Sequence, residues 1–271
     1  MRYLLICLIV LLTAASRFSP GVFAQTATKQ VGGKSIPDLS GLWENRFPRR
    51  PPQVGLCGEP GCRGVSAVLG FPTPDRPPED VEAPQMLPWA EQNYKSAREG
   101  VDDPNGFAHQ EFNPAWSGCM PEGPAEVARL RGFELRQFPD VVLLLYDYDH
   151  QVRRIYVDGR RHPDNRVTTW MGHSIGNYEG DTLVVDTIGI NEKTWIDGAG
   201  HPHTDALHMI ERYRRLNQNS LEIQFTFDDP KAYVKPWTKK VTHELRPPGI
   251  DLWNSAECEE LLRMGTHYSQ K

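Results

Sequence analysis

The segment Gly172-His173-Ser174-Ile175-Gly176 has the spacing Gly-x-Ser-x-Gly, which in hydrolases places a nucleophilic serine on a sharp turn between a strand and a helix. Asp186 and several histidines follow it, in the order that such enzymes use. The residues after the motif, however, lead directly into the apolar run 182–190, so the helix that the turn requires is missing. We therefore expect Ser174 to be a strand residue and not a covalent nucleophile.

The same segment also fits one arm of a β-hairpin. A two-residue turn at Glu179-Gly180 would place His173 directly opposite Asp186, with their β-carbons about 5 Å apart. Alternation would then put both residues on the apolar face and turn Ser174 to the other face. A carboxylate beside an imidazole fixes its tautomer and raises its pKa. His173 and Asp186 are therefore our candidates for general acid–base catalysis, and a structural pair that pins the hairpin is the equal alternative.

A second two-residue turn, at Gln218-Asn219, would put Arg212 and Arg214 on one face with Ile223 and Phe225. An arginine on an apolar face needs a partner, because an unpaired buried charge is costly. Asp186 on the preceding strand or an anionic ligand could serve, so Arg212 is a candidate ligand-binding residue. His243 also aligns with apolar neighbours, and we expect it to be structural.

The segment 191–206 is a long loop that is rich in chemically useful side chains, and long loops in compact domains are often functional. Our candidate ligand-binding residues in and just after it are Trp195, Asp197, His201, His203, Asp205 and His208. The spacing of these histidines fits neither a helical zinc pair nor a cupin pattern, so no residue is assigned as a metal ligand and no cofactor is expected. A metal-dependent hydrolase built on residues 191–208 remains an alternative.

The elements that would position these residues are strands. Alternating runs separated by short linkers rich in Asp, Gly and Asn predict consecutive hairpins over 133–138, 141–148, 152–157, 169–177, 182–190, 207–216, 221–227 and 237–245. The expected fold class is all-β and mainly antiparallel, an up-and-down barrel of about eight strands. A two-layer β-sandwich is the alternative.

The chain divides into three parts. Residues 1–24 have the charged, apolar and small-residue regions of a secretory signal peptide. Residues 25–112 are rich in Pro and Gly, with one short strand at 40–43 and one helix at 88–98, and residues 113–271 form the barrel domain with a short helix at 255–264. We therefore expect a periplasmic or secreted protein whose mature chain has no membrane span.

Cysteine content and charge limit the partners. Removing the signal leaves 28 basic and 35 acidic side chains, with no dense basic run, which argues against nucleic acid. Four cysteines remain, an even number that favours disulfides in an oxidising compartment. Of three pairings, Cys57 with Cys62 and Cys119 with Cys258 is the favoured one. The expected partner is a small-molecule ligand or substrate.

Two resemblances extend this interpretation. Gly41-Leu42-Trp43 ahead of a meander resembles the Gly-x-Trp signature of lipocalins and related calycin barrels, which implies an alternative role for Arg212, packing over Trp43 at a closed barrel end. Residues from 38 onward resemble a group of exported bacterial proteins of unknown function, in stretches that include Glu179-Gly180-Asp181-Thr182-Leu183.

The function that we expect from the sequence follows from these points. An exported barrel would take a small, partly apolar molecule into its lumen and act on it through His173 and Asp186, as a lyase, isomerase or hydrolase. A non-catalytic carrier that uses the same cavity is the alternative from another class.

Overall fold

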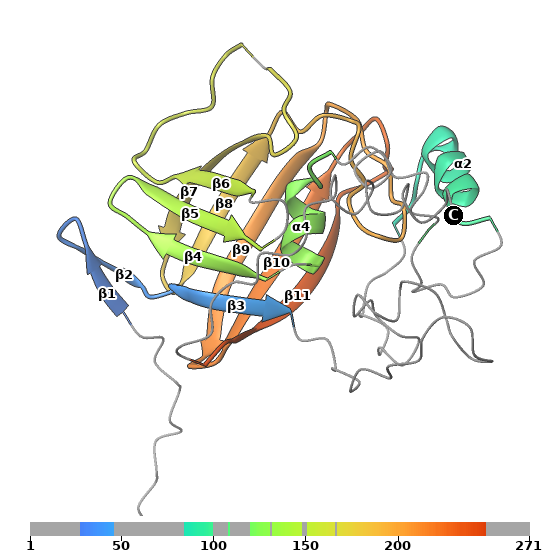
Figure 1. Ribbon diagram of the computed structural model, residues 1–271. Coiled ribbons are helices and arrows are strands. Elements are labelled where there is room, and N and C mark those ends of the chain that lie inside the picture. The colour runs from blue at the N-terminus through green and yellow to red at the C-terminus, as the bar shows by residue number, and fades with distance from the viewer. Residues whose placement is uncertain are drawn as a thin grey trace, which may run out of the picture.

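The computed structural model describes residues 28–45, 84–99, 108, 120–130, 132–147, 151–165 and 167–247. Nine strands close into one barrel (Figure 1). They are β3 (Gly41–Asn45), β4 (Phe133–Gln137), β5 (Val141–Tyr146), β6 (Val152–Tyr156), β7 (His173–Glu179), β8 (Thr182–Ile188), β9 (His208–Asn217), β10 (Ser220–Asp228) and β11 (Trp237–Leu245). The predicted signal peptide, the cysteines and the C-terminal helix lie outside the described residues.

The barrel confirms the predicted fold class, and because its sheet closes on itself it is not the alternative two-layer sandwich. From β4 to β11 each strand pairs with the next strand in sequence, and β3 is the ninth strand, set between β11 and β4. A closed ring with an odd number of strands cannot be antiparallel throughout, because directions must alternate around it. The one parallel pair that such a ring requires is formed by β6 and β7. The barrel is thus mainly antiparallel, as predicted, but a longer connection joins β6 to β7 in place of a hairpin.

Three elements lie outside the ring. A hairpin of β1 (Thr28–Val31) and β2 (Lys34–Pro37) precedes it. The helix expected at 88–98 is α2 (Pro88–Ala97), which begins at a proline whose missing N–H costs nothing there. The helix α4 (Pro124–Leu130) was not expected from the sequence. Neither helix of the described ranges is long or apolar enough to cross a bilayer.

Packed side chains fill the barrel lumen. Six of the inward-pointing residues with no exposed surface are Trp43, Phe133, Leu144, Ile155, Val185 and Ile223. An internal space that admitted water would give its lining residues accessible surface, so no such space touches these side chains. The described residues of α4 are buried as well, and Ala125, Val127 and Ala128 belong to the same hydrophobic cluster. The lumen is therefore a solid core at these positions, and α4 extends it (Figure 1).

Candidate functional site

The β7–β8 hairpin has a different register from the predicted one. Its loop residues are Gly180 and Asp181, and Gly180 adopts the positive φ of 61° that a two-residue hairpin loop needs. Glu179 therefore lies opposite Thr182. In consequence His173 pairs with Ile188, and Asp186 pairs with Ile175. The predicted direct pairing of His173 with Asp186 is wrong, because the turn lies one residue further along the chain.

The faces of this hairpin are also inverted relative to the prediction. His173 and Asp186 do share a face, but it is the outer face of the barrel, where both are partly exposed. Ser174 and Thr187 point inward and are buried. Both faces of the hairpin carry apolar residues, so alternation alone could not tell inside from outside. The inner face is the one whose side chains, Ser174 and Thr187, contact the polar groups buried in the lumen.

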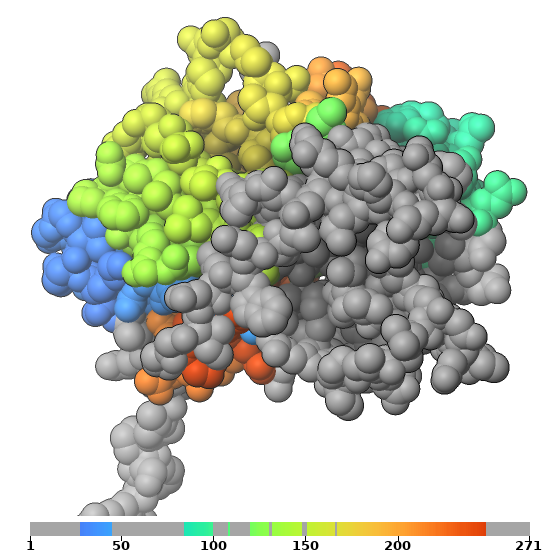
Figure 2. All heavy atoms as spheres, viewed as in Figure 1, coloured from blue at the N-terminus to red at the C-terminus, as the bar shows by residue number. Residues whose placement is uncertain are grey.

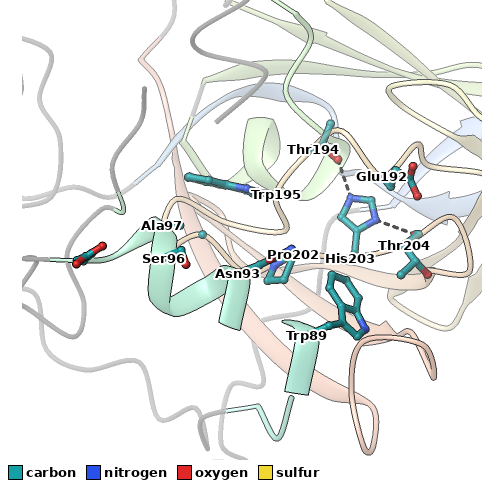
Figure 3. A pocket seen from close by; sticks show the side chains of 12 residues that line it. Trp89, Asn93, Ser96, Ala97, Glu192, Thr194, Trp195, Pro202, His203 and Thr204 are labelled. Atoms are coloured by element: carbon teal, nitrogen blue, oxygen red, sulfur yellow. Dashed lines mark hydrogen bonds between the residues drawn. The ribbon is translucent and has the colours of Figure 1, made fainter. Parts of the chain in front are cut away.

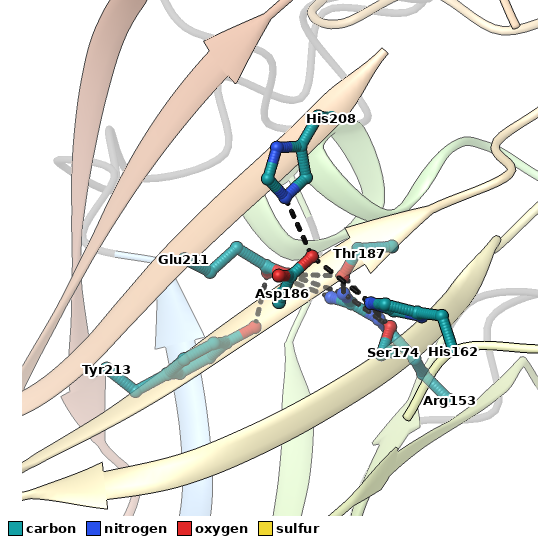
Figure 4. A network of polar contacts seen from close by, with 8 residues as sticks. All are labelled: Arg153, His162, Ser174, Asp186, Thr187, His208, Glu211 and Tyr213. Carbon is teal, nitrogen blue, oxygen red and sulfur yellow. Dashed lines mark hydrogen bonds and ion pairs between the residues drawn. The ribbon is translucent and has the colours of Figure 1, made fainter. Parts of the chain in front are cut away.

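The lumen holds a buried ion pair between Arg153 on β6 and Glu211 on β9 (Figure 4). Arg153 donates to Glu211 Oε1 at 2.8 Å, to Glu211 Oε2, and to Thr187 Oγ1 at 2.8 Å. Its Nε and Nη2 also donate to Ser174 Oγ, at 3.2 and 3.0 Å. Tyr213 donates to Glu211 Oε1 at 2.8 Å. Sequence reasoning missed Arg153 and Glu211 as a pair, because two strands separate them in the barrel.

This lumen network is closed and structural in character. Burial raises the pKa of Tyr213 well above its ordinary value, and the charge of Glu211 adds to the rise. Burial also raises the pKa of Tyr146, which Arg153 partly opposes. Both tyrosines therefore stay protonated. Ser174 lies on a strand, faces away from His173 and hydrogen-bonds to Arg153, so it lacks the geometry of an activated nucleophile.

The outer face carries a chain of polar contacts that does join His173 to Asp186, through a residue that the sequence did not suggest. His162, in the connection 157–172, places Nδ1 2.8 Å from Nδ1 of His173 and Nε2 3.2 Å from Oδ1 of Asp186. His208 places Nε2 2.8 Å from the same carboxylate oxygen. Figure 4 shows His162 and His208 approaching Asp186 from different directions. Figure 2 shows the connection 157–172 protruding beside the barrel.

One arrangement of protons satisfies every contact in this outer chain. His162 and His208 donate from Nε2 to Asp186, and His173 donates from Nδ1 to Nδ1 of His162. Partial burial alone would raise the pKa of Asp186, but His208 and His162 outweigh it and lower that pKa below its ordinary value. Partial burial and the charges of His162 and Arg160 lower the pKa of His173. The chain is thus a string of hydrogen-bonded groups that can hold and pass protons.

Arg212 lies on the outer face, contrary to the prediction. The turn is the predicted one, with Asn217 opposite Ser220, but a bulge at Ser220/Leu221 shifts the register by one residue. Such a shift exchanges the two faces of a strand. Arg212 therefore pairs with the exposed Glu179 at 3.0 Å. Arg215 takes the place over the Trp43 ring, with Cζ 5.1 Å from the ring centre.

A pocket of about 600 Å³ lies between α2 and the loop 191–207 (Figure 3). From α2 and the residues directly after it, Trp89, Asn93, Ser96, Ala97 and Glu99 line this end pocket, and the loop contributes Glu192, Thr194, Trp195, Gly200, Pro202, His203 and Thr204. Its volume is typical of sites for small organic molecules. Of the predicted ligand-binding residues, the structure places Trp195 and His203 in this lining.

Specific contacts hold the helix against the loop and the barrel. The rings of Tyr94 and His201 stack with their centres 4.5 Å apart. Trp89 donates from its indole nitrogen to the Lys231 carbonyl at 2.7 Å, and the backbone N–H of Leu87 donates to Ala232 at 2.8 Å. The end pocket therefore has one wall fixed to the connection between β10 and β11.

His203 is held as a neutral imidazole in the pocket wall. Burial lowers its pKa, although the Thr204 carbonyl and nearby carboxylates oppose the shift. Nδ1 lies 3.0 Å from the carbonyl oxygen of Thr204, so it carries the proton, and Nε2 accepts from the hydroxyl of Thr194 at 2.7 Å. Both nitrogens are occupied (Figure 3). His203 therefore shapes the pocket and is not a free base.

The other predicted loop residues are dispersed. Asp197 is buried and contacts His201 at 2.8 Å and Lys239 at 2.9 Å, which outweigh the effect of burial and hold its pKa well below the ordinary value. Asp205 forms an exposed ion pair with Lys231 at 3.0 Å. His208 belongs to the outer chain. Within the described ranges, no group of three His, Cys, Asp or Glu residues is arranged to hold a metal ion.

The fold and the site define the class of this molecule: a closed, mixed β-barrel with a filled lumen and a pocket at one end. Comparison with protein-family models, curated proteins and solved structures finds no match to the chain.

Proposed function

We propose that this protein binds a small, partly apolar molecule in the end pocket between α2 and the loop 191–207. The observation that carries the proposal is the pocket itself, about 600 Å³ and lined by two indole rings together with hydroxyl, amide and carboxylate groups. Apolar walls with a few fixed polar groups are the usual composition of small-molecule sites. The lumen positions that a calycin-like ligand would occupy are filled by core side chains.

Binding without chemistry is the form of this proposal that the pocket favours. The one imidazole among the described lining residues, that of His203, uses both nitrogens in contacts with Thr194 and Thr204. A general base needs a free lone pair within reach of the proton that it removes. We therefore propose that the end pocket binds its ligand as a carrier does, without catalysing a reaction.

A fragment screen by ligand-observed NMR tests the proposal. Trp195→Ala removes the largest apolar group that the loop gives to the pocket, so it should weaken the fragments that bind the native protein by roughly tenfold or more. Phe138→Ala is the matched control, because Phe138 is an exposed aromatic residue between β4 and β5. Fragments whose affinity is unchanged by Trp195→Ala, or lowered equally by Phe138→Ala, would count against the end pocket.

A second candidate function is acid–base chemistry on the outer face, favoured by the chain that links His173, His162, Asp186 and His208. The side chains of Asp186 and His208 are 38% and 43% exposed, so a substrate in solution can reach this end of the chain. His173 would act through His162 as a positioning residue.

Activity screening against hydrolase, isomerase and lyase substrates tests this second candidate. Any activity found should fall in His162→Gln and Asp186→Asn, and the double variant should lose much less than the sum of the two effects. His203→Gln is the control, since His203 lies in the end pocket. Activity that survives both outer-face substitutions would eliminate this candidate.

A further inference from the structure

The charged groups in the lining of the end pocket are all acidic. Glu192 from the loop and Glu99 after α2 are the only charged side chains among the described lining residues. His203 adds no positive charge, because burial lowers its pKa and its tautomer is neutral. Among the described lining residues there is thus no cation to receive an anionic ligand.

Two lysines near the pocket are engaged by carboxylates. Lys231, whose carbonyl receives the indole N–H of Trp89, pairs with Asp205 at 3.0 Å. Lys239 pairs with the buried Asp197 at 2.9 Å. Each of these two ammonium groups is paired with a carboxylate, so neither adds unbalanced positive charge beside the lining.

The aromatic groups of the pocket also favour a positively charged ligand. Trp89 and Trp195 come from opposite walls of the pocket, the first from α2 and the second from the loop (Figure 3). Tryptophan has the most favourable ring for binding a cation, and quaternary ammonium ligands are commonly recognised by aromatic rings. An anionic or strongly polar neutral ligand would gain less from this combination.

We propose that the ligand of the end pocket is an organic cation, an ammonium group carrying apolar substituents that pack against Trp89 and Trp195 while Glu192 supplies the counter-charge. This inference rests on the proposed binding function and adds the chemical class of the ligand. Glu192 lies on an exposed part of the loop, so its carboxylate can change without disturbing the core.

Paired probes that differ in charge and share their shape test the inference. Choline is compared with 3,3-dimethylbutan-1-ol, and naphthalen-2-ylmethylammonium with naphthalen-2-ylmethanol, by isothermal titration and saturation-transfer NMR at low and high salt. At low salt the cationic member of each pair should bind roughly tenfold more tightly, and the advantage should shrink at high salt.

Three variants separate the two proposals. Glu192→Gln should weaken the cationic probes several-fold and leave the affinity of the neutral probes unchanged. Glu222→Gln makes the same charge change on the outer face of β10, and it should leave the affinities of both the cationic and the neutral probes unchanged. Trp195→Ala should weaken both members of each pair.

The outcomes are distinct. Equal binding of both members, lost together in Trp195→Ala, would overturn the cationic ligand and leave the pocket function standing. Binding of neither member to the native protein would count against both proposals. A cationic advantage that persists in Glu192→Gln would overturn the role given to that carboxylate.

Discussion

Arg153 on β6 donates a 2.8 Å hydrogen bond to Glu211 on β9, across the two strands that lie between them in the barrel. Neither side chain is accessible to solvent, and Ser174, Thr187 and Tyr213 satisfy their remaining polar atoms. The pair therefore ties together four strands of the wall. Burying the two charges costs free energy of desolvation, and their mutual attraction offsets this cost only while both partners are present.

Breaking this pair on one side should be strongly destabilising. Glu211→Gln leaves the guanidinium of Arg153 buried without a counter-charge, which should lower the free energy of unfolding by about 3–5 kcal/mol. The double variant Arg153→Met, Glu211→Leu should lose much less than the two single variants together. Arg212→Gln, which removes the exposed neighbouring arginine, should cost less than about 1 kcal/mol. Urea unfolding measures all three, and a cost for Glu211→Gln no larger than that for Arg212→Gln would contradict the buried pair.

His243 should make the protein sensitive to mild acid. It is buried on β11 against Phe133, with ring centres 5.0 Å apart, and burial lowers its pKa to about 4, although the backbone of Ala128 slightly opposes the shift. Neither ring nitrogen makes a well-formed hydrogen bond to the described residues. Between about pH 4 and 6.5 the unfolded chain binds this proton and the folded chain does not. Above pH 6.5 the imidazole is neutral in both states and does not reduce stability. As the pH decreases from 6.5 to about 4, the free energy of unfolding should therefore fall by about 3 kcal/mol because of this residue.

His243→Leu tests this linkage. The variant should be at least as stable as the native protein at pH 7, and its advantage should grow as the pH falls toward 4. Val241→Leu alters the same wall without a titrating group and should leave the slope unchanged. Chemical unfolding at a series of pH values measures the difference, and parallel curves for His243→Leu and the native protein would refute it. His173 and His203, whose pKa values are also lowered, account for part of the remaining slope.

The carboxyl of Asp186 should report on the outer chain. In the native protein its pKa lies below the ordinary value, because His208 and His162 outweigh partial burial. His208→Gln removes one of the two opposing groups, so the pKa of Asp186 should rise. Carboxyl ¹³C NMR measures it, with Asp158 as an internal control, because the hydrogen bonds that Arg160 donates to Asp158 remain in the variant. A pKa of Asp186 that stays unchanged would show that His208 does not belong to the chain.

The positions of the nine barrel strands could be predicted from this sequence, but which face of β7, β8 and β9 points into the barrel could not. The hairpin of β1 and β2 was not predicted. Period-two alternation and short polar linkers located the eight strands of the meander, and Leu42-Trp43 marked the ninth. In β7 and β8 both faces carry apolar side chains, so His173 and Asp186 were assigned to the wrong side. In β9 the bulge at Ser220/Leu221 exchanged the positions of Arg212 and Glu211. A one-residue irregularity leaves no trace in a hydrophobic pattern.

The candidate site was predictable only in outline. Length and composition of the loop pointed to Trp195 and His203, which do line a pocket. His162 carried no signal, because its partners depend on the path of the connection 157–172 across the barrel wall. Arg153 and Glu211 lie 58 residues apart, and nothing local in the sequence relates them.

The central claim, that ligands occupy the end pocket and not the lumen, is tested most directly by ¹⁹F NMR of protein labelled with fluorotryptophan. The chain has seven tryptophans, and Trp→Phe variants assign their signals. Fragments that bind should shift the signals of Trp89 and Trp195 and leave that of Trp43, buried in the lumen, unchanged. A shift of Trp43 without a shift of Trp89 or Trp195 would contradict the account.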